Sequence, residues 1–193
     1  GTVYAGNLTP DATGLGAWSA DDFWRAMHHG RSRDGRLLAP AFPYTAFTHV
    51  NRDDSDALWA YLLSVPAVSQ AARPHELRFP YGTQAALWAW RQLYFRPGAP
   101  PDDAQRSAEW KRGAYLVRGL GHCAACHAPR NAWGAHDDTL GGGFMPGRLW
   151  WAPSLLAPRG TDERLIELLR TGQSAQGSAL GPMAEVVRQS TQH

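Results

Sequence analysis

The chain has 193 residues, of which 44% are hydrophobic and 19% are charged. This balance is typical of a folded globular chain and excludes a disordered one, and the length suits one large or two small domains. A formal net charge of +2 is too small to indicate a nucleic-acid partner. No run of about 18 apolar residues predicts a membrane span.

Capping residues and apolar spacing predict five main helices separated by long loops. Ser19 is the expected N-cap of the first helix, which ends at Gly30. In chain order the expected helices cover residues 20–29, 53–63, 84–94, 104–119 and 162–170, with a short segment at 184–188. In the fifth helix the inward residues are expected to be Leu165, Leu168 and Leu169. Residues 31–44 and 128–158 are predicted to be mostly loop.

The only two cysteines lie in the pentapeptide Cys123-Ala124-Ala125-Cys126-His127. This is the attachment sequence of a c-type haem: each thiol adds to one vinyl group, and His127 follows as the proximal iron ligand. The alternatives are a redox-active cysteine pair, half of a zinc site, or inert core thiols. No βαβ pattern and no second Cys/His pair accompany the motif, and inert thiols do not need the histidine. We therefore predict one covalently attached haem c.

Haem attachment also indicates where the protein works. Covalent ligation of haem c belongs to the periplasmic side, so an exported protein is expected. No charged-then-apolar leader follows Gly1, and we expect that a leader was removed or lies outside this sequence. The expected location is the periplasm, at the outer face of the inner membrane if the partners are held there.

An internal repeat is present at a spacing of 142 residues. It pairs Ser19 with Thr161, Gly30 with Gly172, and Gly35 with Gly177. Both copies show a loop, a capped helix, a glycine, a second glycine five residues on, and a proline-flanked loop. In the second copy this loop contains Met183, and a one-residue slip places Phe42 at the matching position of the first copy.

The repeat predicts an all-α, loop-rich fold of tandem class I cytochrome c-like domains. Residues 1–66 are expected to form a partial domain without CxxCH, and residues 67–101 a linker with an aromatic helix. Residues 102–193 are expected to form the domain that carries the haem and lacks its C-terminal helix. The chain thus combines the C-terminal part of one domain with the N-terminal part of another.

A sulfur ligand opposite His127 would give the His/Met pair typical of electron-transfer cytochromes. Met27 lies on the apolar face of a helix and is predicted to be core. Met145 follows His127 by only 18 residues in a glycine-rich loop, whereas Met183 follows by 56 and comes after the expected helix. We prefer Met183, because the chain can then pass round the haem first.

Other side chains have two interpretations each. A histidine is less favoured than methionine as distal ligand; His28 and His29 end a helix, where a protonated side chain is favourable, and His122 is badly directed. Four aromatic residues could either pack in an ordinary core or form an apolar shell around the haem: Trp133, Phe144, Trp150 and Trp151. A contact with haem propionates or simple solvation are the alternatives for Arg130 and Arg148.

Several stretches of the chain are characteristic of one family. They are Asn7-Leu8-Thr9-Pro10, Arg33-Asp34-Gly35, Pro40-Ala41-Phe42-Pro43-Tyr44, residues 121–131 and residues 181–187. Here the chain resembles the multi-haem cytochrome c subunits of bacterial membrane-bound dehydrogenases. The resemblance implies that Cys123, Cys126, His127 and Met183 are the attachment and axial positions of the family's second haem domain.

The resemblance also has departures. Members of the family place a methionine where Phe42 stands, as the axial ligand of their first haem, and phenylalanine cannot coordinate iron. This leaves two alternatives. Either a first haem is bound with an open or substituted sixth position, or the first domain binds no haem. The family's third haem domain and membrane anchor are missing, so further haems and membrane association are expected only from the full-length protein or its partners.

We predict an electron-carrier subunit rather than an enzyme, with no catalytic residues of its own. It is expected to accept electrons from a dehydrogenase catalytic subunit and to pass them to quinone or another cytochrome. The alternative is a haem enzyme or gas sensor with an open distal site, in which Met183 does not bind iron.

Overall fold

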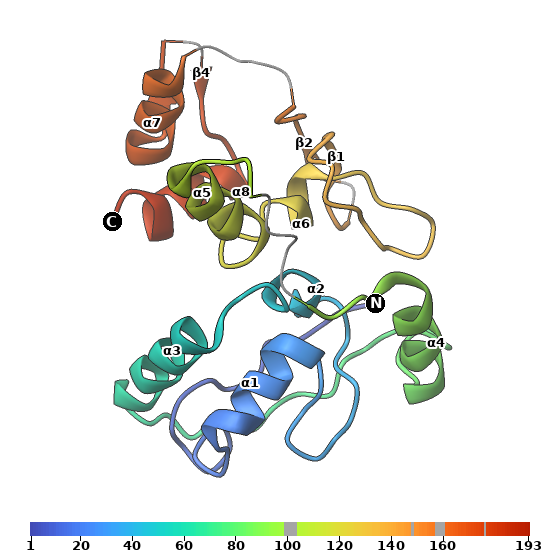
Figure 1. The fold of residues 1–193 in the computed structure, drawn as a ribbon. Coiled ribbons are helices and arrows are strands. Elements are labelled where there is room, and N and C mark those ends of the chain that lie inside the picture. Colours follow the sequence, from blue (N-terminus) through green and yellow to red (C-terminus); the bar gives the residue numbers. More distant parts are fainter. Residues whose placement is uncertain (99–103, 148, 157–160, 176) are drawn as a thin grey trace. The chain divides into compact units, whose positions relative to one another are not determined.

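The computed structural model describes residues 1–98, 104–147, 149–156, 161–175 and 177–193 (Figure 1). Its helices are α1 (Ala20–His29), α2 (Tyr44–Phe47), α3 (Arg52–Ser64), α4 (Gln84–Tyr94), α5 (Ala108–Arg118), α6 (Ala124–His127), α7 (Asp162–Thr171) and α8 (Pro182–Val186). Two antiparallel hairpins are formed by β1 (Gly143–Phe144) with β2 (Trp151–Ala152), and by β3 (Gln173–Ser174) with β4 (Gly177–Ser178). A π-helical turn, η1 (Val187–Thr191), follows α8. The described chain is helical and loop-rich, as predicted, and none of its helices has the length and apolarity to cross a bilayer.

The helix ends follow the capping residues. The Ser19 side chain accepts the backbone N–H of Asp22, and the Asp22 side chain accepts the backbone N–H of Ser19, so α1 begins with a capping box. α1 ends where Gly30 takes the left-handed conformation at φ 56°. The start of α5 lies four residues later than predicted, because Ser107 supplies its N-cap.

The structure also contains short elements that the sequence pattern does not reveal. α2, β1 and β2 each have four residues or fewer, which is too short for hydrophobic periodicity to detect. The last helical segment is longer than predicted, because α8 begins at Pro182 and η1 continues to Thr191.

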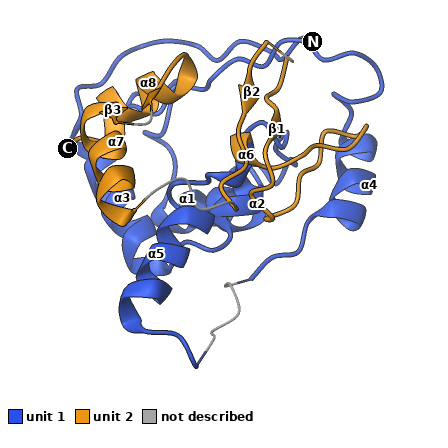
Figure 2. Ribbon diagram, turned by 90° about the horizontal axis from the view of Figure 1, so that it is seen from above, with its two compact units in different colours: residues 1–125 blue, residues 126–193 orange. Residues whose placement is uncertain are grey.

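The described residues divide into two compact units, residues 1–125 and residues 126–193 (Figure 2). The division falls inside α6, between Ala125 and Cys126. The predicted domains 1–66, 67–101 and 102–193 remain a prediction, and each unit is described below by itself.

Unit 1 has a hydrophobic core that joins α1 to the segments around it. Its buried cluster comprises Leu15, Phe23, Met27 and Val50. Phe23 and Met27 lie four residues apart on one face of α1. Met27 is 3% exposed, which confirms its predicted place in the core. Phe42 packs against the same cluster and is therefore part of this core.

α4 is attached to unit 1 through both of its ends. At its start, the Gln84 side chain accepts the backbone N–H of Leu37 at 2.8 Å and donates to the Leu37 carbonyl at 3.1 Å. At its end, the ring of Phe95 lies edge-to-face on that of Tyr44, with ring centres 5.0 Å apart. This helix therefore packs on the segment between α1 and α3.

In unit 2, α7 is less buried than α1 is in unit 1. No residue of α7 is fully buried. Leu168 and Leu169 are half-buried, but Leu165, which was predicted to point inward, is 55% exposed. The principal contacts of α7 are with β3 and η1, and they leave Leu165 uncovered.

Candidate haem-attachment site

The pentapeptide from Cys123 to His127 continues directly from the end of α5. The backbone N–H of Cys123 donates to the Val117 carbonyl at 3.1 Å, and α6 then forms a single turn. Neither cysteine is part of a disulfide, and both are half-buried. Burial raises the pKa of the Cys126 thiol, while the positive charge of Arg130 acts in the opposite direction. Two thiols one helical turn apart match the spacing needed for two thioether bonds to one porphyrin edge.

The His127 imidazole is oriented by a backbone carbonyl. Its Nδ1 lies 2.8 Å from the carbonyl oxygen of Pro153. Since a carbonyl can only accept, Nδ1 carries the proton and the lone pair of Nε2 is available for a metal. A ring N–H donated to a carbonyl is the usual support of a metal-binding histidine. The ring therefore has the tautomer that a proximal haem ligand needs.

The glycine run 141–143 allows the chain to approach His127 closely. Gly142 donates its N–H to the His127 carbonyl at 2.7 Å and has φ 80°. A Cβ at Gly142 would lie 2.6 Å from the Ser154 nitrogen, and one at Gly143 would lie 3.0 Å from the Ala128 oxygen. The sequence pattern predicts only a simple loop for this run. The glycines themselves were the signal, because they permit backbone contacts that a side chain would block.

The four aromatic residues proposed for a haem shell do not form a core. Their exposed fractions are 58% for Trp133, 46% for Phe144, 47% for Trp150 and 59% for Trp151. Ordinary core packing, one of their two interpretations, is therefore wrong. Within the described residues, no group of three His, Cys, Asp or Glu side chains is placed to hold a metal ion, which disfavours a zinc site. Two thiols, one oriented imidazole and exposed aromatic surface fit a covalently bound porphyrin.

Met183 lies near the start of α8 and is half-buried. Two residues before it, Gly181 adopts φ 53°, and a Cβ there would lie 2.6 Å from the Trp150 ring. The Trp150 indole thus covers the backbone that leads into the methionine. Met145 lies after β1, where its N–H donates to the Trp150 carbonyl at 2.9 Å.

The hairpins that follow α1 and α7 have the same backbone pattern. The carbonyl of Gly30 accepts the N–H of Leu38 at 2.9 Å, and that of Gly172 accepts the N–H of Ala179 at 2.8 Å. Phe42 follows the first donor by four residues, as Met183 follows the second. These two residues therefore occupy matching positions.

The one-residue slip between the copies falls within the hairpin. Arg31 pairs with Leu37 in the first copy, and Gln173 pairs with Ser178 in the second, which is one residue closer. Gly177 consequently corresponds to Arg36, not to Gly35 as the constant spacing of 142 suggested.

The surroundings of the two histidines at the end of α1 oppose the expected protonation. Burial lowers the pKa of both His28 and His29, and the neighbouring charges of Arg91 and Arg31 lower that of His29 further. A favourable protonated side chain was the expectation here, and desolvation outweighs the helix dipole. His122 has φ 36° and its ring lies edge-to-face on Phe47.

Of the two arginines considered for haem propionates, Arg130 lies in the segment that follows the motif. Its Nη1 donates to the Gly134 carbonyl at 2.7 Å. Arg148 lies outside the described residues.

The chain is similar to several known proteins over nearly its full length, although no protein-family model matches it. It is 48% identical to a nicotinate dehydrogenase subunit of Pseudomonas putida, covering 97% of this chain and 16% of that protein. It is 37% identical to the gluconate 2-dehydrogenase cytochrome c subunit of Pantoea cypripedii, covering all of this chain and 48% of that protein. A diheme cytochrome c-type protein of Cereibacter sphaeroides is 36% identical over all of this chain and 67% of its own length. The chain thus spans half or less of most of the curated relatives that it matches.

Proposed function

Because the chain belongs to the family of cytochrome c subunits of membrane-bound dehydrogenases, we propose that it carries electrons through a haem c ligated by His127 and Met183. The haem is attached at Cys123 and Cys126 in this proposal, and when bound it supplies an iron that alternates between the ferric and ferrous states. The residues of the chain hold the group and fix its ligands.

The bond from His127 Nδ1 to the Pro153 carbonyl carries this proposal. It restrains the rotation of the ring and increases electron donation from Nε2. A ligand held in one orientation does not need to move when the charge of the iron changes. Such a site is suited to electron transfer rather than to ligand exchange.

Three observations support Met183 as the sixth ligand. It occupies the position that matches Phe42 in the first copy, four residues after the same type of hairpin bond. Its backbone is covered by Trp150 through the close approach at Gly181. Met27, by contrast, is buried in the core of unit 1.

The partner follows from the relatives' names, which are those of dehydrogenase subunits. We propose that a dehydrogenase catalytic subunit donates the electrons and that quinone or another cytochrome accepts them. Haem c attachment and this partner both favour the periplasmic side of the inner membrane.

The test compares Met183→Leu with the matched control Met145→Leu in protein matured by a host that attaches haem c. The unmodified protein and the control should show the weak far-red band of sulfur-ligated ferric haem, and their ferrous forms should not bind CO at neutral pH. Met183→Leu should lose the band and bind CO. An unmodified protein that lacks the band and binds CO would contradict His/Met ligation and favour an open distal site.

A second measurement tests electron transfer itself. The oxidised protein should be reduced by a substrate-loaded dehydrogenase of the families named above, as followed by haem absorption. Failure with every such dehydrogenase, in protein that still shows the far-red band, would contradict the proposed partner while leaving the ligation intact.

A further inference from the structure

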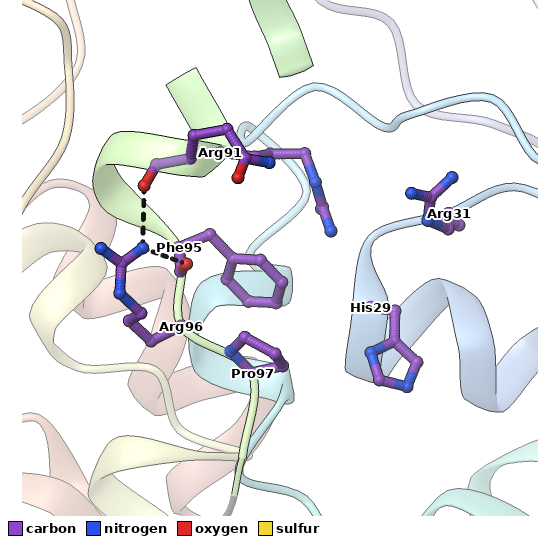
Figure 3. Close-up of a pocket in the computed structure, with 7 residues that line it drawn as sticks. His29, Arg31, Arg91, Phe95, Arg96 and Pro97 are labelled. Carbon is purple, nitrogen blue, oxygen red and sulfur yellow. Dashed lines mark hydrogen bonds between the residues drawn. The ribbon is translucent and has the colours of Figure 1, made fainter. Parts of the chain in front are cut away.

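Unit 1 contains a basic cavity of about 440 Å³ at the ends of α1 and α4 (Figure 3). Its lining residues are His29, Arg31, Arg91, Gln92, Phe95, Arg96 and Pro97. Arg91, Phe95 and Pro97 form one side of it, and His29 and Arg31 face them from the other (Figure 3). None of the described residues that line the cavity is acidic.

The net charge of the cavity is positive even after the helix ends are counted. Each helix C-terminus contributes about half a negative charge, so α1 and α4 together contribute about one. Three guanidinium groups contribute three positive charges. None of the three arginines forms an ion pair with any residue that the structure describes. An excess of about two positive charges therefore remains.

Arg91 is held in place by aromatic rings. Its guanidinium carbon lies 5.1 Å from the centre of the Tyr44 ring and 4.6 Å from that of the Phe95 ring. Tyr44 is fully buried, and its ring lies so close to Gly30 that a Cβ there would be 2.5 Å away. The platform under Arg91 is thus fixed by packing before any ligand binds.

One donor atom of this fixed arginine lacks a partner. Arg91 Nη1 is buried and forms no hydrogen bond with the described residues. The Tyr44 hydroxyl on which Arg91 acts is also buried without a hydrogen-bond partner among the described residues, and buried polar groups are nearly always paired, so two hydrogen-bonding atoms at this end of the cavity remain unsatisfied. Arg96 differs, since its Nη1 already donates to the carbonyls of Gln92 and Phe95 at 2.9 Å each. Arg31 Nη1 forms only a long bond, to the Gly35 carbonyl at 3.4 Å, so Arg96 mainly adds charge, whereas Arg91 and Arg31 keep donors for an anion.

We propose that this cavity binds a compact oxyanion of charge −2, a phosphate or a small dicarboxylate, with Arg31 and Arg91 as its hydrogen-bond donors. Guanidinium groups match the geometry of two oxygen acceptors on one anion. His29 lies opposite Arg91 and gains a favourable charge partner when the anion is present. The site lies in unit 1 and does not depend on the haem ligation proposed above.

The test uses the haem-loaded full chain and inorganic phosphate, with chloride at equal ionic strength as the reference. Calorimetry should show one saturable phosphate site. Arg31→Gln should weaken binding about tenfold or more, the typical value of one charge-assisted hydrogen bond. Arg91→Gln should weaken it at least as much. The matched control is Arg36→Gln, because Arg36 is exposed in the same hairpin and is paired with Asp34.

Two further measurements distinguish a site from general screening. In an NMR titration, phosphate should raise the pKa of His29, whose other charged neighbours are Arg31 and Arg91. Succinate, tested in parallel, should compete with phosphate. Equal effects of phosphate and chloride, or equal losses in Arg31→Gln and Arg36→Gln, would overturn the proposal. Arg31 is exposed, so its substitution remains informative if Arg91→Gln fails to fold.

Discussion

The segments 19–42 and 161–183 have the same backbone pattern but bury their side chains differently. α1 buries Phe23, Ala26 and Met27, whereas α7 buries no residue fully. At the matching position after the hairpin, Phe42 packs against a core of side chains, while Met183 is half-buried. The same backbone pattern therefore occurs in two settings: in unit 1 it brings Phe42 against a hydrophobic core, and in unit 2 it precedes the methionine that we propose as the haem ligand.

The largest expected effect comes from removing the haem attachment. In the double variant Cys123→Ser with Cys126→Ser, no haem should remain bound after denaturation. Hydrogen exchange should then increase in α7 and α8, because these helices bury no residue fully within the described chain and have little packing of their own to protect them. Exchange in α1 and α3 should stay slow, since both helices contribute side chains to the hydrophobic core of unit 1.

The unsubstituted holoprotein is the reference for this experiment. Equal loss of protection in α1 and α7 would show that the two segments do not differ in their need for haem.

A smaller effect is expected when Met183 of the second copy is replaced by phenylalanine, the residue at the matching position of the first copy. Met183→Phe should keep the haem attached but remove the far-red band, because phenylalanine has no donor atom. The reduction potential should fall by part of the ~0.8 V range that axial ligands span. Redox titration measures this shift, with Met145→Leu as the control. An unchanged potential would indicate that Met183 is not a ligand.

Alanine substitutions at glycines with a left-handed backbone test how tightly each of the two segments is packed. Gly30→Ala should destabilise unit 1 by about 3 kcal/mol, from a backbone cost of about 1–2 kcal/mol plus overpacking against the buried Tyr44. Gly35→Ala is the matched control, because φ is 84° there and no atom lies within 4 Å of a Cβ, so only the backbone cost of about 1–2 kcal/mol applies. Denaturant unfolding distinguishes the two.

Gly181→Ala should behave differently from Gly30→Ala. The Trp150 ring that it meets is 47% exposed and can swing outward, so the loss of stability should be close to that of Gly35→Ala. The far-red band should nevertheless weaken, since the backbone next to Met183 loses its cover. A normal band in this variant would argue against a role for Trp150 in holding the loop.

The smallest effect is a pH dependence confined to unit 1. Burial lowers the pKa of His28 and His29 below the ordinary value of 6.5, so the unfolded chain takes up protons before the folded one. Stability that is present above pH 6.5 should therefore be lost as the pH falls through the lowered values. Unfolding at pH 7 and pH 5 checks this, and the double variant His28→Gln with His29→Gln should show a weaker dependence.

The sequence predicted those features that depend on neighbouring residues. The bounds of α1 and α4 were predicted correctly, and those of α3 within one residue, because Ser19, Thr83 and Asn51 cap their own helices. The attachment motif was equally clear, since two thiols and an imidazole at fixed spacing need no tertiary information. Met27 could be assigned to the core from its place on an apolar helix face.

Tertiary structure decided the features that join distant parts of the chain. The Pro153 carbonyl orients His127 from 26 residues away, Trp150 covers Gly181, and Tyr44 supports Arg91. These contacts result from packing, which no local periodicity encodes. For the same reason the sequence predicted an inward Leu165 from helical spacing, whereas exposure is set by which elements pack on α7. Five consecutive residues thus sufficed to predict the chemistry of the site. The contacts that orient those residues depend on the tertiary structure.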